Sequence, residues 1–166
     1  MVSGNPLRNF VIKVNQYPAW LSSRLMTWMF RFKVKLAGTA GVDIVETDLK
    51  SVTFRQKNRK KVQNHIGGVH AAGMALLAES ATGFIVGVNL PGDKLPLIKS
   101  MNLSYVKRST GDMQAIAELT GQQLEELRTA EKGEVTVQVK VTDALNVEPV
   151  LCEMVWAWIP KVKKKQ

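Results

Sequence analysis

The chain has 166 residues, enough for one domain with one sizeable core, and its 45% hydrophobic and 22% charged residues are typical of a globular protein. No run of about 18 apolar residues is present, so the sequence predicts no transmembrane segment. The net charge of +9 favours an anionic partner such as anionic lipid or a phosphorylated ligand, whereas the lack of RNA-binding, zinc and recognition-helix motifs argues against nucleic acid.

Cys152 is the only cysteine, so an internal disulfide cannot form, and a reducing, cytoplasmic compartment is expected. We expect this thiol to be buried in a strand rather than to act as a nucleophile. One cysteine and two histidines do not make a metal site, and we predict neither a metal nor a cofactor. No Asp or Glu precedes Asp43, and residues 161–166 include four lysines that predict a solvated basic tail.

Residues 1–17 are predicted to form an irregular arm. They lack the long apolar core and the small-residue cleavage site of a secretory signal, but they carry no acid, so an organellar presequence stays an alternative. Residues 18–32 predict a helix, because Pro18 suits a first turn and apolar residues recur at helical spacing. The predicted apolar stripe consists of Leu21, Leu25, Trp28, Met29 and Phe32.

This N-terminal helix has three interpretations. It can be docked on the body of the fold, cover an apolar ligand site, or lie on a membrane surface. Trp20, Trp28 and Phe30 offer more apolar surface than a short docked helix needs. We therefore predict that the helix shields an apolar site rather than binding a membrane.

Residues 32–56 contain strand material, broken at 38–41 by two glycines. The alternation over 44–55 changes phase, which predicts a bulge or a twist near Lys50. Residues 57–61 then form a charged loop, which is either a solvated turn or a clamp for a nucleotide phosphate.

The most apolar stretch of the chain follows this loop. Residues 68–82 predict a helix that is apolar on every face, and such a helix must be buried on every face. Gly67 and Gly68 permit a tight entry into it, and Gly83 is a plausible helix stop. Inside this segment the only ionisable groups are those of His70 and Glu79.

The rest of the chain predicts short strands joined by tight turns, with one short exposed helix or loop over 122–130. Tight turns join antiparallel neighbours, so the expected fold class is α+β: a long antiparallel sheet wrapped round a central apolar helix, with an extra N-terminal helix. The predicted strands are 84–90, 97–108, 113–120, 134–142 and 150–159.

Asn64, Gly67, His70 and an acid nine residues later at Glu79 resemble the signature of the hotdog-fold thioesterases, especially the phenylacetate-pathway type. Two positions depart from that signature. Ala71 and Ala72 stand where the family has two glycines, and Gly68 stands where it has Thr or Ser. The order of elements is similar to that of less characterised hotdog proteins with an N-terminal helix, so the resemblance implies a single hotdog domain over 1–166.

Helix geometry separates the two ionisable groups of the motif. Nine residues span about 13 Å of helix and leave His70 and Glu79 on opposite faces. Two antiparallel central helices across a two-fold axis would instead bring one helix N-terminus to the other copy's Glu79. We therefore expect a homodimer, with a dimer of dimers as a further possibility, and the resemblance implies the same arrangement.

The resemblance implies that Glu79, Asn64 and His70 are catalytic. Amide groups near Gly67, Gly68 and Ala71 would hold the oxyanion, and Glu79 would deprotonate water or attack the carbonyl carbon. Burial should raise the pKa of Glu79 and a nearby helix N-terminus should lower it, and the sequence does not decide between them. Structural roles remain the alternatives: a hydrogen bond for Glu79, loop support for His70 and a turn for Asn64. Ser80 and Thr82 receive no role, because they can bond back to their own helix.

The leading functional prediction is an acyl-CoA thioesterase-like hydrolase that needs no metal and no redox cofactor. The alternative is a non-catalytic hotdog protein that binds an acyl chain or acyl-CoA. A hotdog dehydratase is a weaker third possibility, because that chemistry usually needs a histidine–acid pair and only His65 and His70 are available.

Overall fold

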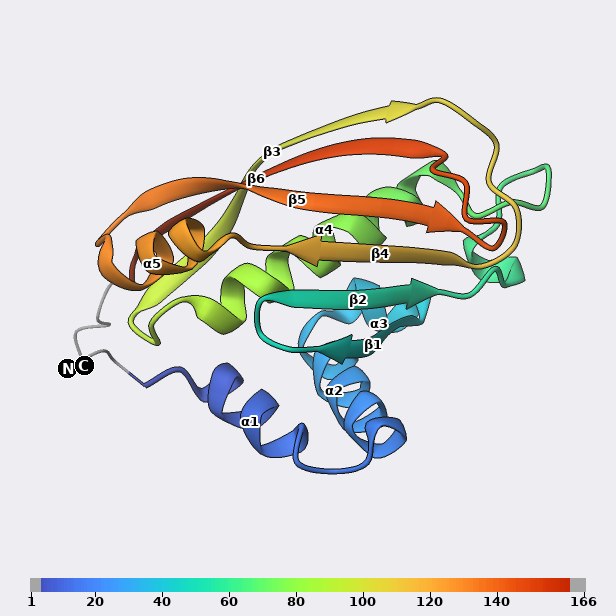
Figure 1. Ribbon diagram of the computed structural model, residues 1–166. Helices are drawn as coiled ribbons and strands as arrows, with labels where there is room; N and C mark the ends of the chain where they lie inside the picture. The colour runs from blue at the N-terminus through green and yellow to red at the C-terminus, as the bar shows by residue number, and fades with distance from the viewer. Residues whose placement is uncertain (1–3, 162–166) are drawn as a thin grey trace.

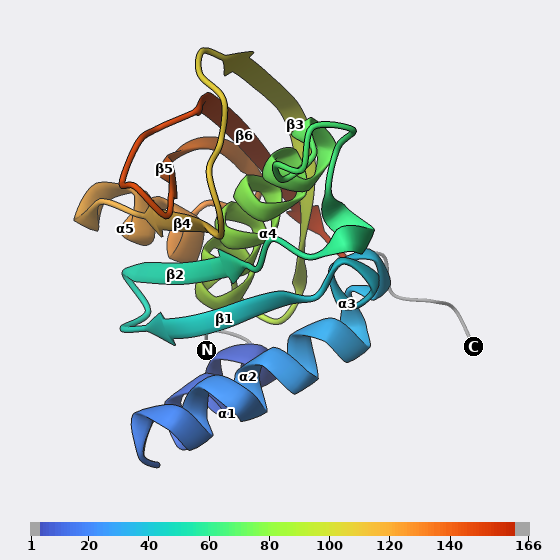
Figure 2. The ribbon, with the colours of Figure 1, turned by 90° about the vertical axis from the view of Figure 1, so that its right-hand side faces the viewer.

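The structure is a computed structural model that describes residues 4–161, so most of the predicted basic tail lies outside the described residues. A six-stranded antiparallel sheet in the order β1-β2-β4-β5-β6-β3 curls round the long helix α4, as Figures 1 and 2 show. This confirms the predicted architecture. The elements are α1 (Pro6–Val14), α2 (Ala19–Lys33), α3 (Lys35–Ala40), β1 (Val42–Thr47), β2 (Ser51–Gln56), a 3₁₀ turn η1 (Lys60–Val62), α4 (Ala71–Asn89), β3 (Lys94–Tyr105), β4 (Met113–Glu118), α5 (Gly121–Thr129), β5 (Gly133–Asp143) and β6 (Val150–Pro160).

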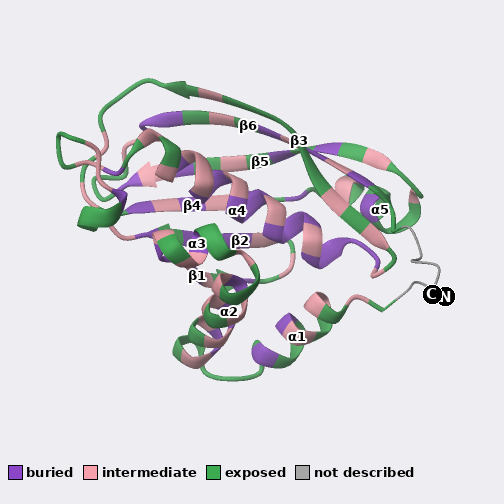
Figure 3. Ribbon diagram, turned by 180° about the vertical axis from the view of Figure 1, so that it is seen from behind, coloured by how far each residue is buried: buried purple, intermediate pink, exposed green. Residues whose placement is uncertain are grey.

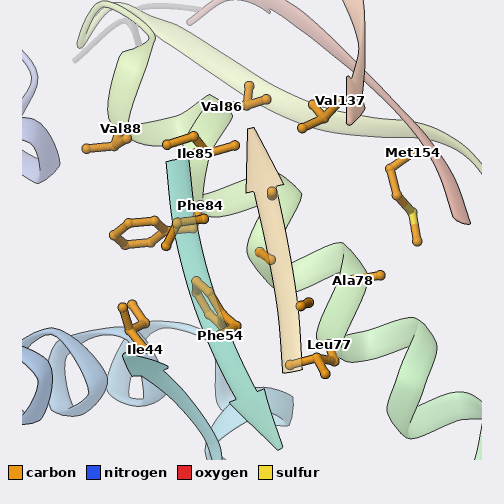
Figure 4. Packing of buried hydrophobic residues seen from close by; sticks show 14 of the residues in the cluster. Ile44, Phe54, Leu77, Ala78, Phe84, Ile85, Val86, Val88, Val137 and Met154 are labelled. Atoms are coloured by element: carbon orange, nitrogen blue, oxygen red, sulfur yellow. The ribbon is translucent and has the colours of Figure 1, made fainter. Parts of the chain in front are cut away.

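The central helix starts later and ends later than predicted. His70 is its N-cap, and the helix continues through Gly83 to Asn89, so the expected stop at Gly83 and the expected strand over 84–90 are both wrong. Gly83 serves packing instead, because the indole of Trp156 lies directly over it. A short apolar run fits a buried helix as well as a strand, and here its side chains fill the space inside the sheet, as Figure 4 shows for Phe84 and Ile85.

By length and composition alone α4 is apolar enough to cross a membrane, with a mean hydropathy of 1.6. Its contacts give it another role, since it packs against β2, β3, β4, β5 and β6. The colouring in Figure 3 shows the buried positions spread along this helix. It is the core helix of the fold, as its apolar character on every face predicted.

The N-terminal residues are more ordered than predicted. Residues 6–14 form helix α1 rather than an irregular arm, and Asn5 caps it by accepting a hydrogen bond from the Arg8 amide. The Asn5 side chain also donates to the carbonyl groups of Gly87 and Leu90 at the end of α4. This cap therefore fastens α1 to the core helix, which no local pattern in the sequence indicates.

Helix α2 confirms the predicted helix, and Leu25 and Met29 of the predicted stripe pack against the core, but the buried face is centred elsewhere. Ser22, Met26 and Phe30 point inward, whereas Trp28 and Phe32 of the predicted stripe are exposed. The prediction placed the large aromatic residues on the inward face. The buried face includes the small polar Ser22, which the hydrophobic pattern does not mark. The strand material expected directly after this helix is the short helix α3.

The strands β1 and β2 form a hairpin, so the change of phase near Lys50 is a tight turn. In addition, the β1–β2 register shifts between Ile44 and Glu46. Helix α2 lies along the outer edge of β1 (Figure 2), where Thr27 and Arg31 hydrogen-bond to the backbone of Ile44 and Val42. The free edge of β1 is therefore covered by side chains of its own chain.

Three aromatic rings join the helices to the sheet. Phe30 of α2, Phe54 of β2 and Phe84 of α4 meet edge to face, with ring centroids 5.1 to 6.0 Å apart. Such pairs add stability beyond the area that they bury. This cluster fixes α2 against α4 and so defines one wall of the cavity described next.

Candidate active site

Glu79 lines an apolar cavity of about 280 Å³ between α2, α4, β3 and β6, with Leu7 of α1 at one side. Gly83 and Gly87 leave room along the helix surface, and Lys33 and Ser80 are the other polar side chains of the lining. The apolar walls are formed by Leu7, Met29, Phe30, Val34, Phe84, Pro96 and Trp156. Helix α2 therefore does cover an apolar site, through Met29 and Phe30 rather than through Trp20 and Trp28.

The carboxyl group of Glu79 is half-buried and has no hydrogen-bond or ion-pair partner among residues 4–161. Burial raises its pKa above the ordinary value for glutamate. The sequence left open whether burial or a helix N-terminus would dominate, and within one chain burial does. A raised pKa suits a base that must accept a proton near neutral pH.

Ser80, for which no role was predicted, is another polar residue of this cavity. Its side chain is 3% exposed, and its hydroxyl has no hydrogen-bond partner in the described part of the chain. Thr82 behaves as expected, because its hydroxyl donates to the carbonyl of Ala78 and accepts from the indole of Trp156. A buried hydroxyl without a partner is costly, but the Ser80 oxygen has almost no accessible surface, so the side chain must turn before it can bind a ligand in the cavity.

His70 lies in a different place. It caps α4, where its Nδ1 accepts a hydrogen bond from the Ala72 amide, so the neutral ring carries its proton on Nε2. It lines a second cavity of about 270 Å³ together with Leu36 and Leu76. Within one chain His70 and Glu79 therefore do not share a cavity, as the helix geometry predicted.

The loop before α4 uses most of its amide groups internally. The Asn64 side-chain oxygen accepts hydrogen bonds from the amides of Ile66 and Gly68, and the Gly67 amide donates to the Asn64 carbonyl. Gly67 has a φ of +84°, which favours glycine. Gly67 and Gly68 are thus engaged as donors, and Asn64 shapes the loop.

Ala71 remains as the candidate oxyanion donor. Among the described residues its amide has no hydrogen-bond acceptor, and it stands at the first position of α4, where the helix dipole favours negative charge. The hydroxyl of Tyr105, at the end of β3, donates to the Ala71 carbonyl, 2.8 Å away. Tyr105 was not singled out from the sequence, and only the fold brings it to this helix.

Two further predicted features are the thiol of Cys152 and the charged loop over 57–61. Burial, with the nearby Glu148 carboxylate, raises the pKa of Cys152 to about 11, so this half-buried thiol is a poor nucleophile. In the charged loop Lys61 binds the carbonyl of Thr39, whereas Arg59 and Lys60 are exposed. No cluster of three or more potential metal-ligating side chains occurs within residues 4–161.

Several solved structures are similar in fold to this chain. A protein of unknown function from Pseudomonas aeruginosa, described as a probable thioesterase, matches with a TM-score of 0.75 and 20% identity over 83% of this chain and 95% of its own. A Haemophilus influenzae thioesterase matches with a TM-score of 0.68 and 12% identity over 90% and 96%. A Staphylococcus aureus thioesterase variant matches with a TM-score of 0.64 and 18% identity over 76% and 99%.

At these identities the similarity shows the fold alone, and it confirms the predicted hotdog fold. The comparison with curated proteins found no match. A family model described as "Domain of unknown function (DUF4442)" matches residues 22–159, which is well over half of the chain. The chain therefore belongs to the family described as "Domain of unknown function (DUF4442)", with the fold of the hotdog thioesterases.

Proposed function

We propose that this protein hydrolyses acyl thioesters, with acyl-CoA as the substrate class. The observation that carries the proposal is the apolar cavity of about 280 Å³ lined by the Glu79 carboxyl group and by Ser80, neither of which has a side-chain partner among residues 4–161. Its walls suit an acyl chain, and the net charge of +9 suits the anionic coenzyme A. Solved proteins with the same fold are described as thioesterases.

In the proposed reaction, oxygen from water bonds to the thioester carbon, the carbon–sulfur bond breaks, and the thiolate takes up a proton. Glu79 takes the water proton as general base, or it attacks the carbonyl carbon and forms an anhydride that water then hydrolyses. The Ala71 amide stabilises the negative charge on the carbonyl oxygen. Ser80 turns its hydroxyl into the cavity and donates a hydrogen bond to the bound substrate. We predict no metal and no cofactor.

The active unit is a homodimer in this proposal, because α4 keeps Glu79 about 13 Å from its own N-terminus. One edge of the sheet supports it. Among the described strands β3 pairs only with β6, whereas side chains of α2 cover the edge of β1. Tyr105 at one end of β3 contacts Ala71, and Pro96 near the other end lines the cavity of Glu79, so antiparallel pairing of β3 with its copy would bring the Ala71 amide of one chain toward Glu79 of the other. A further doubling to a tetramer stays an expectation, as does a cytoplasmic location.

The inner face of β3 supports the same arrangement. Met101 lies opposite Met154, which is buried against the core, so the Met101 side chain points to the same face of the sheet. It is nevertheless 46% exposed, and Ile98 and Tyr105 on that face are exposed too. Helix α4 covers this apolar strip only in part, and a second copy would bury the rest.

The alternative function is non-catalytic binding of an acyl chain or acyl-CoA. It is favoured by the amides of Gly67 and Gly68, which hold the loop and are not free to bind an oxyanion. In that case Glu79 and Ser80 would anchor a polar end of the ligand. Binding of acyl-CoA without release of its thiol distinguishes this function from hydrolysis.

The test is thiol release from a panel of acyl-CoAs by the parent, by Glu79→Gln and by Glu126→Gln, which changes an exposed acid on α5. Hydrolysis is expected for the parent and for Glu126→Gln, with a loss of about 10²–10⁴-fold for Glu79→Gln. Saturable binding of acyl-CoA without thiol release by the parent would establish the binding function instead. Equal rates for all three proteins would exclude Glu79 from the reaction.

A further inference from the structure

The outward face of α2 and α3 carries large apolar and aromatic side chains that are exposed. Trp20, Trp28 and Phe32 recur on one side of α2 and are 64%, 68% and 58% exposed, and Leu36 of α3 is 64% exposed. The opposite side of the same helix, with Met29 and Phe30, faces the cavity of Glu79. The exposed face therefore has no part in the core or in the cavity of Glu79, although Leu36 also lines the cavity of His70.

Cations surround these side chains. A groove of about 590 Å³ runs between α2 and the β1–β2 edge, and Arg24, Arg31, Lys35 and Arg55 line it with Asp43 as the only acid. Arg31 and Arg55 both pair with Asp43, at 2.5 and 3.5 Å, whereas Arg24 and Lys35 form no ion pair within residues 4–161. The groove thus keeps a net charge of +3.

The aromatic rings and the cations form one surface. The rings of Trp28 and Phe32 stack with centroids 6.0 Å apart, and the Lys35 ammonium lies 4.4 Å from the Phe32 centroid. Lysine and arginine interleaved with Trp, Phe and Leu are the composition of helices that lie in the interface of an anionic bilayer. The acid-free first 42 residues extend the same positive charge.

We propose that this face of α2 and α3 docks on an anionic phospholipid bilayer, so that α2 shields the Glu79 cavity with one face and binds a membrane with the other, where the sequence predicted only the first role. Lipid phosphates bind to Arg24 and Lys35 in the groove, while Trp20, Trp28, Phe32 and Leu36 enter the headgroup region. A second copy of the chain is a poorer occupant, because a two-fold contact through this face would set one +3 groove against another. The proposal does not depend on the proposed hydrolysis.

Vesicle binding tests it with the full chain. The protein is mixed with vesicles of phosphatidylcholine alone, or of equal parts phosphatidylcholine and phosphatidylglycerol, and the bound fraction is measured by flotation. Brominated lipids provide a second readout through tryptophan quenching. Trp156 and Trp158 are buried, at 6% and 1% exposure, so quenching reports on Trp20 and Trp28.

We expect binding only to the phosphatidylglycerol vesicles, with quenching. Arg24→Gln with Lys35→Gln should weaken vesicle binding about 30-fold, since each cation near an anionic surface contributes about 5-fold to the affinity. The matched double change Lys107→Gln with Lys132→Gln, on the loops after β3 and α5, removes the same charge and should leave binding nearly intact. Trp28→Ser with Phe32→Ser should weaken binding and reduce quenching to what Trp20 contributes, whereas Leu145→Ser, another exposed apolar position, should change neither.

Three results would overturn the proposal. They are no binding to the anionic vesicles, equal weakening by the two double charge changes, and a smaller assembly for Trp28→Ser with Phe32→Ser in the absence of lipid. The last result would assign this face to a second copy of the chain.

Discussion

Trp156 lies so close to Gly83 that a β-carbon at residue 83 would be 2.6 Å from the indole ring. The same indole donates a hydrogen bond to Thr82, one residue earlier in α4. The ring is therefore held by a polar contact and a steric contact at once. It forms part of the cavity wall beside Glu79.

Gly83→Ala should lower the free energy of unfolding by about 1–3 kcal/mol, because the ring or the helix must shift to admit the methyl group. Gly87→Ala is the control on the same face of α4, since a β-carbon there would lie 3.8 Å from Leu7, an ordinary contact. It should be neutral or slightly stabilising, because alanine favours helix. Urea unfolding of both variants measures the difference, and equal destabilisation would contradict the packing argument.

Glu79 should control the pH dependence of hydrolysis. Burial raises its pKa, so the catalytic carboxylate forms only as the pH rises above the ordinary range for glutamate. We expect the kcat/KM for an acyl-CoA to increase with pH through that raised pKa, and Glu79→Asp to keep a pH-dependent rate where Glu79→Gln does not. A rate already constant at the ordinary glutamate pKa would show that Glu79 is not the titrating base.

Glu79 should also affect stability in a pH-dependent way. Below the ordinary pKa the carboxyl is protonated in both the folded and unfolded states, so the parent and Glu79→Gln should unfold at similar free energies. As pH rises through the raised folded-state pKa, the parent loses stability, because the folded state must hold a desolvated charge. Unfolding curves from about pH 4 to pH 7 should therefore separate in favour of Glu79→Gln. Separation in the opposite direction would reveal a partner that stabilises the carboxylate.

Ser80→Ala should separate function from stability. The Ser80 hydroxyl has no partner in the described structure, so its removal should leave the free energy of unfolding unchanged or slightly higher. Ser22→Ala is the matched control, because the buried Ser22 donates to the Asn15 side chain and should lose about 0.5–1.5 kcal/mol. Turnover should fall about 10-fold or more in Ser80→Ala alone. Loss of stability in Ser80→Ala without loss of turnover would indicate a structural hydroxyl.

Met101→Lys should disrupt the proposed dimer. The change places a charge on the inner face of β3, which a second copy would bury, and a buried unpaired charge is costly. Leu97→Lys is the control on the other face of the same strand, where Leu97 lies opposite Ala157 and has a similar exposure. Sedimentation at micromolar concentration should show a monomer for Met101→Lys and a dimer for Leu97→Lys and the parent. A dimeric Met101→Lys would place the interface elsewhere.

Features that depend on local pattern could be predicted from the sequence. The alternating valines at 135, 137, 139 and 141 predicted β5, and the apolar run after His70 predicted a helix inside the sheet. The spacing of His70 and Glu79 predicted that one chain would keep them apart, and they line separate cavities.

Features that depend on contacts between distant residues could not be predicted from the sequence. Gly83 was interpreted as a helix stop because the sequence does not show Trp156 above it. The anchoring of α1 depends on Asn5 reaching carbonyl groups more than eighty residues away. Ser80 received no predicted role because a helical serine can bond back to its own backbone, and only the tertiary structure shows that this one does not.

The covering of β1 by α2 gives the sheet one closed edge and one open edge. A sheet with two open edges can add copies at both ends without limit, which is the route to fibres. Here Thr27 and Arg31 occupy the backbone groups through which β1 would add a strand. If two copies join through β3, the paired sheet ends on both sides in a covered β1, so growth by strand addition stops at two chains. By covering the edge of β1, helix α2 limits assembly through the sheet to two chains.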